Sequence, residues 1–383
     1  MVHKLLRRII VFAYLVVTGI YLVACVAPYL NPAQWWPFGF FGLAFPYLLF
    51  VLLLFLLGWI IARSRWSWLA IIVLMLSWKN IEAVFALHPF SSFNKENRAA
   101  GSIRIMTWNV KGFFPSEAGI YKKEQRIAHC DSVFNVIRDY SPDIIAIQEF
   151  YSIASVKWFN NLNHLRNMGY RYSFFPGDFT RYKDNYSGTA IFSKYPIVDS
   201  VRTKMPQEEG DNVESLLSAD IVCHNDTIRV FTGHLQSYRF MPEDYVNLSK
   251  IKRNPEERLD ASKSIARKMR TAFTKRAVQT NIIRRHLDSS VYPEIFCGDL
   301  NDVPNTYSYF SVKRDKRDAY IAKGFGFGQT FYSFSSRYMQ QISTLRIDYI
   351  FTDPQFRILQ CTRVPVVLSD HIPVVADIVL DDQ

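Results

Sequence analysis

Six short motifs place polar side chains at the ends of apolar strands, or inside them, where such side chains are unusual. The stretch "CGDLNDVPNT" (residues 297–306) puts Asp299 and Asn301 in a turn after the run "YPEIF". Asp, Asn and Pro are ordinary turn formers, so this stretch taken alone fits a plain loop. Asp348 in "RIDYIF" is harder to explain in that way, because a carboxylate inside an apolar strand needs a partner or a metal.

Together, the polar residues of the six motifs supply the groups that metal-assisted phosphoester hydrolysis needs. Oxygen ligands suit a hard cation such as Mg²⁺ and not zinc. A carboxylate such as Asp299 can take a proton from water. Asn301 lies two residues further along, on the same face of an extended chain, and can position that water. A histidine–aspartate pair supplies an imidazole held in one tautomer, with charge to offer a phosphate. The eight residues are Asn109, Glu149, His234, Asp299, Asn301, Asp348, Asp370 and His371.

Some of these residues also have a purely structural interpretation when they are considered singly. Asn109 and Glu149 fit solvated strand ends, and His234 fits a half-buried histidine with satisfied hydrogen bonds. Asp370 and His371 fit a turn before the last strand. The functional interpretation therefore depends on the whole set.

The order of the six motifs resembles that of a known superfamily. "TWNV", "DIIAIQE", "GHLQS", "GDLNDVP", "RIDYIF" and "SDHIPV" look like the endonuclease/exonuclease/phosphatase superfamily, with the deoxyribonuclease I-like fold, over about residues 102–380. The resemblance implies a four-layered α/β sandwich of two mostly antiparallel sheets flanked by helices. It is strongest to uncharacterised, membrane-anchored bacterial members.

The resemblance also implies a metal site. Asn109 and Glu149 would bind Mg²⁺ or Mn²⁺, and Asp370 would lie at the metal or beside its ligands.

For the reaction itself, the resemblance implies in-line attack by water without a covalent intermediate. Asp299 would activate or orient the water, and Asn301 would support the attacked phosphate. His371 would contact that phosphate, oriented by Asp348, and His234 matches the other active-site histidine of the superfamily. No substrate-binding residue is predicted.

The N-terminal part has the composition of membrane spans. No Asp, Glu, Lys or Arg occurs from Ile9 to Ala62. We predict a transmembrane region over residues 1–87, with spans near 9–27, 38–62 and 66–87. A signal peptide is the alternative for the first segment, but it lacks a clear cleavage site and another long span follows. The third segment, which contains Lys79 and Glu82, either crosses or lies on the surface, and we expect it to cross.

Basic clusters predict the orientation of these spans. The clusters at Lys4/Arg7/Arg8 and Arg63/Arg65 should both be cytoplasmic, as two intervening spans allow. A third crossing then places the rest of the chain on the periplasmic side of a bacterial inner membrane. A surface-lying third segment would leave it in the cytoplasm.

We predict a linker over residues 88–101 and one catalytic domain over 102–383. Its short strands and intervening helices indicate two packed sheets with helices outside. "GTAIFSKYPIV" is predicted as one strand, and a hairpin is predicted to turn at Asn225–Asp226. Helices are predicted over Lys123–Tyr140 and Glu257–Leu287. The inner face of the second helix is expected to carry Ala266, Met269, Phe273 and Ala277.

Of the five cysteines, Cys25 lies in a predicted membrane span. The other four are scattered without CxxC spacing, which argues against a zinc site or a disulfide framework, and we expect them to be buried apolar residues: Cys130, Cys223, Cys297 and Cys361.

The substrate stays open between nucleic acid and phospholipid. Inositol polyphosphate 5-phosphatases are disfavoured, because their Trp-Cys-Asp-Arg stretch is replaced here by "LRIDYIF". Residues 239–286 carry thirteen Lys and Arg against five Asp and Glu, which fits either an anion-binding surface or a solvated helix face. A catalytically inactive, membrane-tethered binding protein is the alternative of another class, and no protein partner is predicted.

Overall fold

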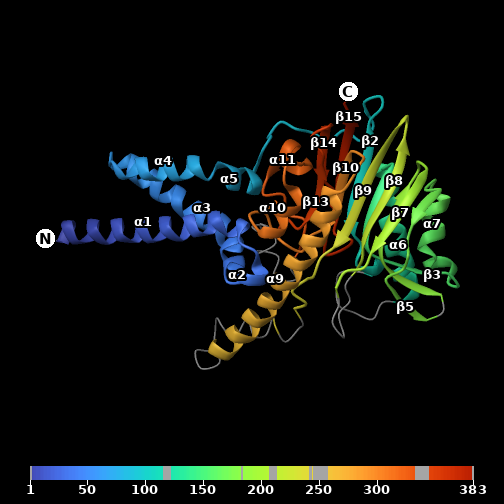
Figure 1. Cartoon of the computed structure of the whole chain (residues 1–383), viewed down its shortest axis with the longest axis horizontal. Helices are drawn as coiled ribbons and strands as arrows, with labels where there is room; N and C mark the ends of the chain where they lie inside the picture. Colours follow the sequence, from blue (N-terminus) through green and yellow to red (C-terminus); the bar gives the residue numbers. More distant parts are fainter. Residues whose placement is uncertain are drawn as a thin grey trace. The chain divides into compact units, whose positions relative to one another are not determined.

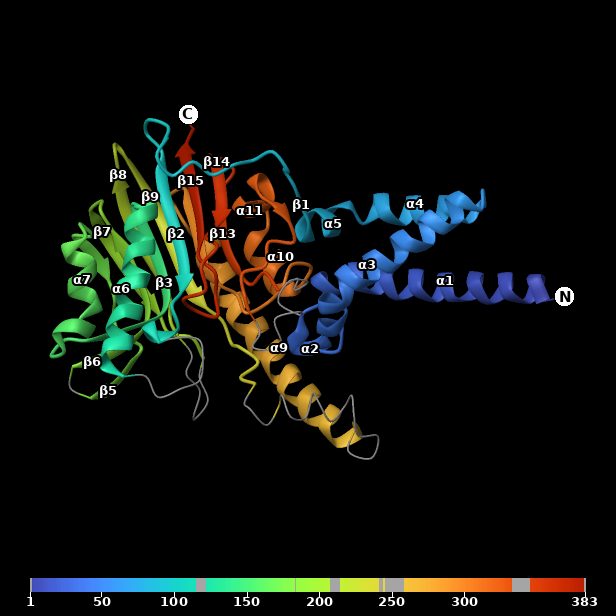
Figure 2. The same ribbon diagram turned by 180° about the vertical axis from the view of Figure 1, so that it is seen from behind.

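The computed structural model describes residues 2–114, 122–182, 184–206, 214–240, 244, 258–332 and 345–381. The chain forms two compact units that are not contiguous in sequence. Unit 1 contains residues 1–84, 236–280 and 303–311, and unit 2 contains 85–235, 281–302 and 312–383 (Figures 1 and 2). The predicted domain limits at residues 87 and 102 stay a prediction.

Unit 1 contains the apolar N-terminal helices. They are α1 (Val2–Val26), η1 (Ala27–Tyr29), α2 (Pro32–Trp35), α3 (Phe38–Ile61), α4 (Trp66–Leu76) and α5 (Trp78–Val84). Residues 4–29 and 38–61 are each long and apolar enough to cross a membrane. The third predicted span corresponds to α4 and α5, which are bent by 68° at Ser77, so it could cross only as a broken helix. Its crossing stays a prediction.

A buried pair of amides ties distant segments of unit 1 together. Asn80 of α5 donates to the side-chain oxygen of Asn305 (2.6 Å) and to the carbonyl of Cys25. Asn305 in turn donates to the carbonyl of Ala24 (3.0 Å). Both amides are buried, so these bonds satisfy groups that water does not reach. They join segments more than 200 residues apart in the sequence.

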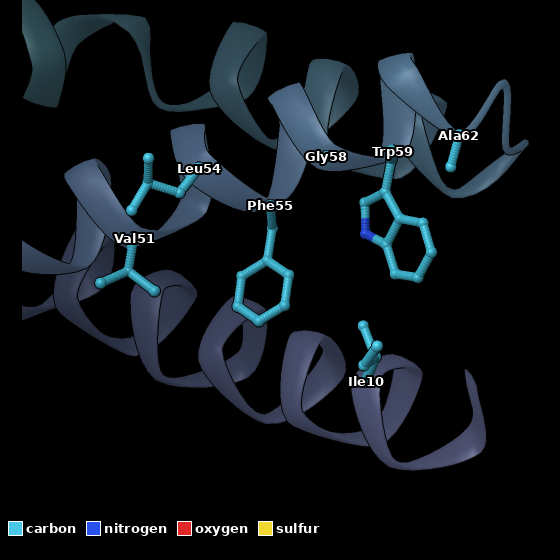
Figure 3. A pocket seen from close by; sticks show the side chains of 7 residues that line it. All are labelled: Ile10, Val51, Leu54, Phe55, Gly58, Trp59 and Ala62. Atoms are coloured by element: carbon cyan, nitrogen blue, oxygen red, sulfur yellow. The ribbon is translucent and has the colours of Figure 1, made fainter. Parts of the chain in front are cut away.

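An apolar pocket of about 480 Å³ lies between α1 and α3 (Figure 3). Ile10 lines it from α1, and residues of α3 such as Val51, Phe55 and Trp59 face it from the other side. The lining belongs to the two candidate spans, so hydrocarbon is the environment that suits it. It supplies no acid or base for chemistry.

Unit 2 is built on two sheets, each with one parallel pair of strands and otherwise antiparallel pairs. The first follows the order β14-β15-β2-β3-β6-β4, with β5 also paired to β6, and the second the order β11-β13-β10-β9-β8-β7. The parallel pairs are β2–β3 and β9–β10. The strands of the first sheet are β2 (Ile103–Asn109), β3 (Ile144–Ile153), β4 (Tyr172–Phe174), β5 (Phe179–Tyr182), β6 (Asn185–Ser193), β14 (Phe356–Arg363) and β15 (Val374–Leu380). Those of the second are β7 (Ile197–Thr203), β8 (Leu216–Cys223), β9 (Asp226–His234), β10 (Glu294–Asp299), β11 (Arg317–Asp318) and β13 (Asp348–Thr352).

Helices cover the outer faces of both sheets. Strand β2 shows how this works: Ile103 and Ile105 face the core between the sheets, whereas Met106 and Trp108 face helix α6 (Lys123–Tyr140). With both faces covered, the strand reads as a nearly continuous apolar run. Figure 1 shows α6 and α7 (Asn161–Asn167) along this sheet.

On the second sheet, the C-terminal part of α9 (Arg258–Asp288) contributes Ile283, which packs over Gly233 of β9. The predicted four-layered sandwich is therefore confirmed.

The remaining short elements of unit 2 complete the sandwich. They are β1 (Ala86–Leu87), η2 (Lys111–Phe113), η3 (Lys157–Phe159), α11 (Ala319–Lys323) and β12 (Phe325–Gly326), and α10 (Tyr307–Lys313) begins in unit 1.

Two predicted strand features are wrong. "GTAIFSKYPIV" forms two strands, because β6 pairs in one sheet and β7 in the other, with a break at Lys194–Pro196. The hairpin turns at His224–Asn225, one residue earlier than predicted, since Cys223 pairs with Asp226.

Both predicted helices are confirmed, the first with the same bounds and the second shifted by one residue to α9. Phe273 and Ala277 are buried as predicted, whereas Ala266 and Met269 are half-buried. Outside α1, the cysteines Cys130, Cys223, Cys297 and Cys361 are all buried and free, as expected.

The segment 88–101 has no helix or strand, yet it is tied to unit 2. Arg98 pairs with Asp143, and the backbone amide of Asn94 donates to the Gln360 side chain (2.8 Å). The Arg104 guanidinium also donates to the Lys95 carbonyl. These contacts hold the segment against the sandwich.

Candidate active site

The candidate site is organised by strand β10, whose last residue is Asp299. In the sheet register, Asp299 lies beside Asp348 at the start of β13 and beside His234 at the end of β9. The other sheet contributes Asn109, which ends β2, and Glu149 of β3. Asn109 reaches across to donate to Asp299 (Nδ2 to Oδ2, 3.2 Å), so the site is formed where strand ends of both sheets meet.

Local backbone features aim two of these side chains. β3 is irregular between Ile147 and Phe150, and Glu149 within this bulge has φ of 51°. Bulges redirect a side chain next to active sites, and this one leaves the Glu149 side chain 41% exposed. Gly298 precedes Asp299 because a Cβ there would lie 2.3 Å from the Gly233 carbonyl oxygen on the neighbouring strand.

The turn after β10 holds Asp299 and Asn301 together. The Asn301 amide N–H donates to Asp299 Oδ1 (2.7 Å), and its side chain donates to the carbonyl of Leu235 (2.9 Å). Asn301 has φ of 48°, a region that Asn tolerates better than most residues. The turn therefore fixes both groups while leaving Asp299 Oδ2 facing the site.

Two imidazoles face this oxygen. His371 Nε2 lies 3.7 Å from Asp299 Oδ2, and His234 Nε2 lies 3.5 Å from it. Each ring is held from behind by a carboxylate through its other nitrogen. Asp348 lies 3.0 Å from Nδ1 of His371, and Glu214 lies 3.3 Å from Nδ1 of His234.

Glu214 was not among the residues predicted for the site. It is buried and accepts from the Thr189 hydroxyl (2.8 Å) and from the backbone N–H of Glu149. Glu214 thus positions both His234 and the bulge that carries Glu149. In the sequence, Glu214 is a charged residue shortly before the apolar strand "LLSADIVC", and no recognised motif contains it.

The buried charges set unusual protonation states. Burial raises the pKa of Asp299 to about 6, although His371 and His234 pull it down. Burial opposes protonation of His371, but Asp348 and Asp299 outweigh it and raise its pKa to about 10. Burial likewise opposes protonation of His234, but Glu214, then Asp299 and Glu149, raise its pKa to about 10. At neutral pH both imidazoles therefore favour the protonated form, with Asp299 between them.

Asp370 lies at the edge of this group. Its carboxylate is 2.9 Å from Lys111 Nζ and accepts from the Ser369 hydroxyl. Burial favours the neutral acid, but His371 and Lys111 outweigh it and hold the pKa of Asp370 below its ordinary value. Asp370 is therefore an anion close to His371.

Oxygen donors that suit a hard divalent cation gather around Asn109. Its side-chain amide donates to Glu149 Oε1 (3.0 Å) as well as to Asp299 Oδ2, so the two carboxylates meet at Nδ2, and a cation between them would require the amide to turn. Oxygen ligands, one of them on a partly exposed side chain, suit an ion that keeps several of its waters.

A second grouping, Asp299, Asp348 and His371, also has ligand atoms within 4.8 Å of one another. In this grouping the His371 ring lies between the two carboxylates, with Nδ1 3.0 Å from Asp348 and Nε2 3.7 Å from Asp299.

The structure brings the predicted residues together. Asp299 contacts Asn109, His234 and Asn301, and Glu149 contacts Asn109. His371, which faces Asp299, forms the second histidine pair with Asp348, and Asp370 lies next to His371.

A family model described as the endonuclease/exonuclease/phosphatase family matches residues 106–371, and the chain belongs to this family. Its members are hydrolases of phosphoester bonds and generally use divalent metal ions. A second model, a domain of unknown function (DUF8431), matches residues 7–84. Among curated proteins none matches the chain.

Solved structures are also similar to this chain. A humanized D. rerio TDP2 is 16% identical, over 73% of this chain and 99% of that chain, with a TM-score of 0.50. An endonuclease/exonuclease/phosphatase from Beutenbergia cavernae is 20% identical, over 73% and 72% of the two chains, with a TM-score of 0.49. The human Nocturnin catalytic domain is 19% identical, over 73% and 93%, with a TM-score of 0.47. At 16% identity, the likeness to the TDP2 structure extends to the fold alone.

Proposed function

We propose that the protein is a membrane-anchored, divalent-metal-dependent phosphoester hydrolase of the phosphodiesterase or nuclease type, which uses in-line attack by water. The observation that carries this proposal is the position of Asp299 between two histidine–carboxylate pairs, His371–Asp348 and His234–Glu214. A base flanked by two imidazolium ions suits a reaction at a centre that carries negative charge.

Glu149 and Asn109 would hold Mg²⁺ or Mn²⁺, with Asp370 at the metal or beside its ligands. Such an ion polarises a phosphoryl oxygen and stabilises developing charge. The Asn109 amide presents Nδ2 to both carboxylates while its Oδ1 accepts from the Lys111 backbone N–H (3.1 Å). Direct ligation by Asn109 would therefore require its amide to turn.

Asp299 would accept the proton of the attacking water through Oδ2, because its pKa of about 6 leaves it ionised yet basic at neutral pH. Asn301 would support the attacked phosphate from the same turn. His371 would donate from Nε2 to a phosphate oxygen, since Asp348 occupies its Nδ1. His234 would act in the same way on the other side of Asp299.

We further propose that α1, α3 and the bent α4–α5 segment cross a bacterial inner membrane, as a multi-pass protein, and that the third crossing places the catalytic residues on the periplasmic side. The charge distribution of the N-terminal region supports this orientation. Alkaline phosphatase and green fluorescent protein, each fused after Gln383, test it. An active phosphatase fusion is expected, and a fluorescent protein fusion with an inactive phosphatase would reverse the orientation.

Catalysis is tested with the full chain in detergent, using bis-p-nitrophenyl phosphate and Mg²⁺. We expect hydrolysis that stops with a chelator and with Asp299→Ala, and that persists with Asp226→Asn, which changes an exposed carboxylate at the start of β9. Equal rates for wild type and Asp299→Ala would contradict the proposal. The absence of turnover on DNA, RNA, sphingomyelin and phosphoinositides would instead favour a tethered binding protein.

A further inference from the structure

The N-terminal part of α9 carries a basic stripe on one face, formed by Lys263, Arg267 and Arg270. Spacings of four and three residues place these side chains in one row along the helix, and all three are exposed. The opposite face buries Ile265 and Ala272. In the described part of the helix, one carboxylate lies within 4 Å of the stripe: Asp260, 3.8 Å from Lys263. Asp260 is itself exposed, so it offsets the positive charge only weakly.

This part of α9 packs on the first residues of candidate span α3 and on Trp36 just before it, within the same unit. The Phe273 ring contacts the Phe40 ring (centroids 5.3 Å apart) and lies so close to Gly39 that a Cβ there would be 2.8 Å from it. The Arg270 guanidinium lies over the Trp36 ring at 5.2 Å. Both views in Figures 1 and 2 show α2 beside α9.

These contacts locate the basic stripe at the end of a membrane span. Trp35 and Tyr29, in the same connection between α1 and α3, are 53% and 61% exposed. Exposed aromatic residues at the ends of spans mark the headgroup level of a bilayer. Basic residues at that level meet lipid phosphates, whereas a solvated helix face needs no such position.

We propose that the face of α9 formed by Lys263, Arg267 and Arg270 binds the headgroups of anionic phospholipids at the membrane interface. The inference rests on the proposed membrane anchoring. Each cation near an anionic surface contributes on the order of a fivefold gain in binding. Nucleic acid is the competing polyanion, and the position beside the start of α3 favours lipid.

The test uses the full chain in neutral detergent with equal amounts of phosphatidylglycerol and phosphatidylcholine of matched acyl chains. Native mass spectrometry gives the ratio of the two lipids that the protein retains. We expect enrichment of phosphatidylglycerol that weakens as NaCl is raised. The variant Lys263→Gln/Arg267→Gln/Arg270→Gln should lower the enrichment at least about tenfold. The control Arg284→Gln/Arg285→Gln removes exposed charges further along the same helix and should leave it unchanged.

Three results would overturn the inference: no enrichment in the wild type, equal enrichment in the triple variant, or displacement of the bound phosphatidylglycerol by an equimolar single-stranded oligonucleotide. Equal thermal unfolding midpoints and equal hydrolysis of bis-p-nitrophenyl phosphate would show that the triple variant is folded. Failure of the anchoring proposal is distinguishable, because the chain would then be released from membranes by alkaline carbonate.

Discussion

Replacement of Glu214 by Gln tests whether the Glu214 carboxylate keeps His234 protonated. The substitution keeps the shape of the side chain but removes the carboxylate that contacts His234 Nδ1 at 3.3 Å. An amide oxygen at this position can still accept from the Thr189 hydroxyl, which now donates at 2.8 Å. The variant is therefore expected to fold and to lose mainly the charge interaction with His234.

The expected loss of activity follows from the strength of this interaction. A hydrogen bond to a charged group contributes about 1.5–3 kcal/mol, which corresponds to roughly a 10- to 150-fold lower kcat/KM if it stabilises the transition state. Glu214 is also the strongest influence raising the pKa of His234 to about 10, against the opposing effect of burial. His234 is protonated below its pKa, so the alkaline limb of the pH–rate profile should move to lower pH in the variant.

The assay is kcat/KM for bis-p-nitrophenyl phosphate over a pH range that includes both limbs of the profile. Asp220→Asn is the matched control, since Asp220 is another buried carboxylate in this region, paired with Arg229 (2.6 Å) on the neighbouring strand. This control should keep the wild-type profile. A Glu214→Gln profile that falls by the same factor at every pH, with no shift of the alkaline limb, would refute the proposed role of this charge.

Asp348→Asn should lower kcat about 10²- to 10⁴-fold, because the amide can no longer stabilise protonated His371; unchanged kcat would exclude that role. Glu149→Gln should raise the Mg²⁺ concentration for half-maximal activity at least about tenfold, measured by metal titration, and an unchanged titration would remove Glu149 from the metal site. In the wild type, kcat/KM should fall as pH decreases through about 6, where Asp299 gains a proton; a flat acid limb would contradict its role as base. Asn305→Leu should destabilise the full chain by about 1–2 kcal/mol relative to Asn305→Gly, because Asn305 has φ of 67° and both variants lose the same side-chain hydrogen bonds; equal denaturation midpoints would contradict this.

Much of the site could be predicted because its residues end recognisable strands. Asp299 and His234 follow apolar runs, and the ends of neighbouring strands meet at one edge of a sheet. Glu214 could not be found in this way, since it lies before its strand and acts through His234, whose partner depends on side-chain packing.

The fold was predictable to a similar extent. The apolar run over residues 188–198 indicated one strand, but its division between two sheets depends on pairing with distant strands. Likewise, the Asn80–Asn305 contact joins segments 225 residues apart, and local patterns carry no information on it. The membership of residues 236–280 in unit 1 is therefore visible only in the structure.

The central claim is that a water molecule, activated by Asp299, attacks the phosphorus of the substrate. Hydrolysis in H₂¹⁸O tests this claim most directly. With the full chain and Mg²⁺ in excess over a phosphodiester, one ¹⁸O should enter the phosphate of the product, none should enter the released alcohol, and Asp299 should stay unlabelled after this single turnover. Label in the alcohol or in the Asp299 carboxylate, or hydrolysis that continues without a divalent metal, would contradict the proposed mechanism.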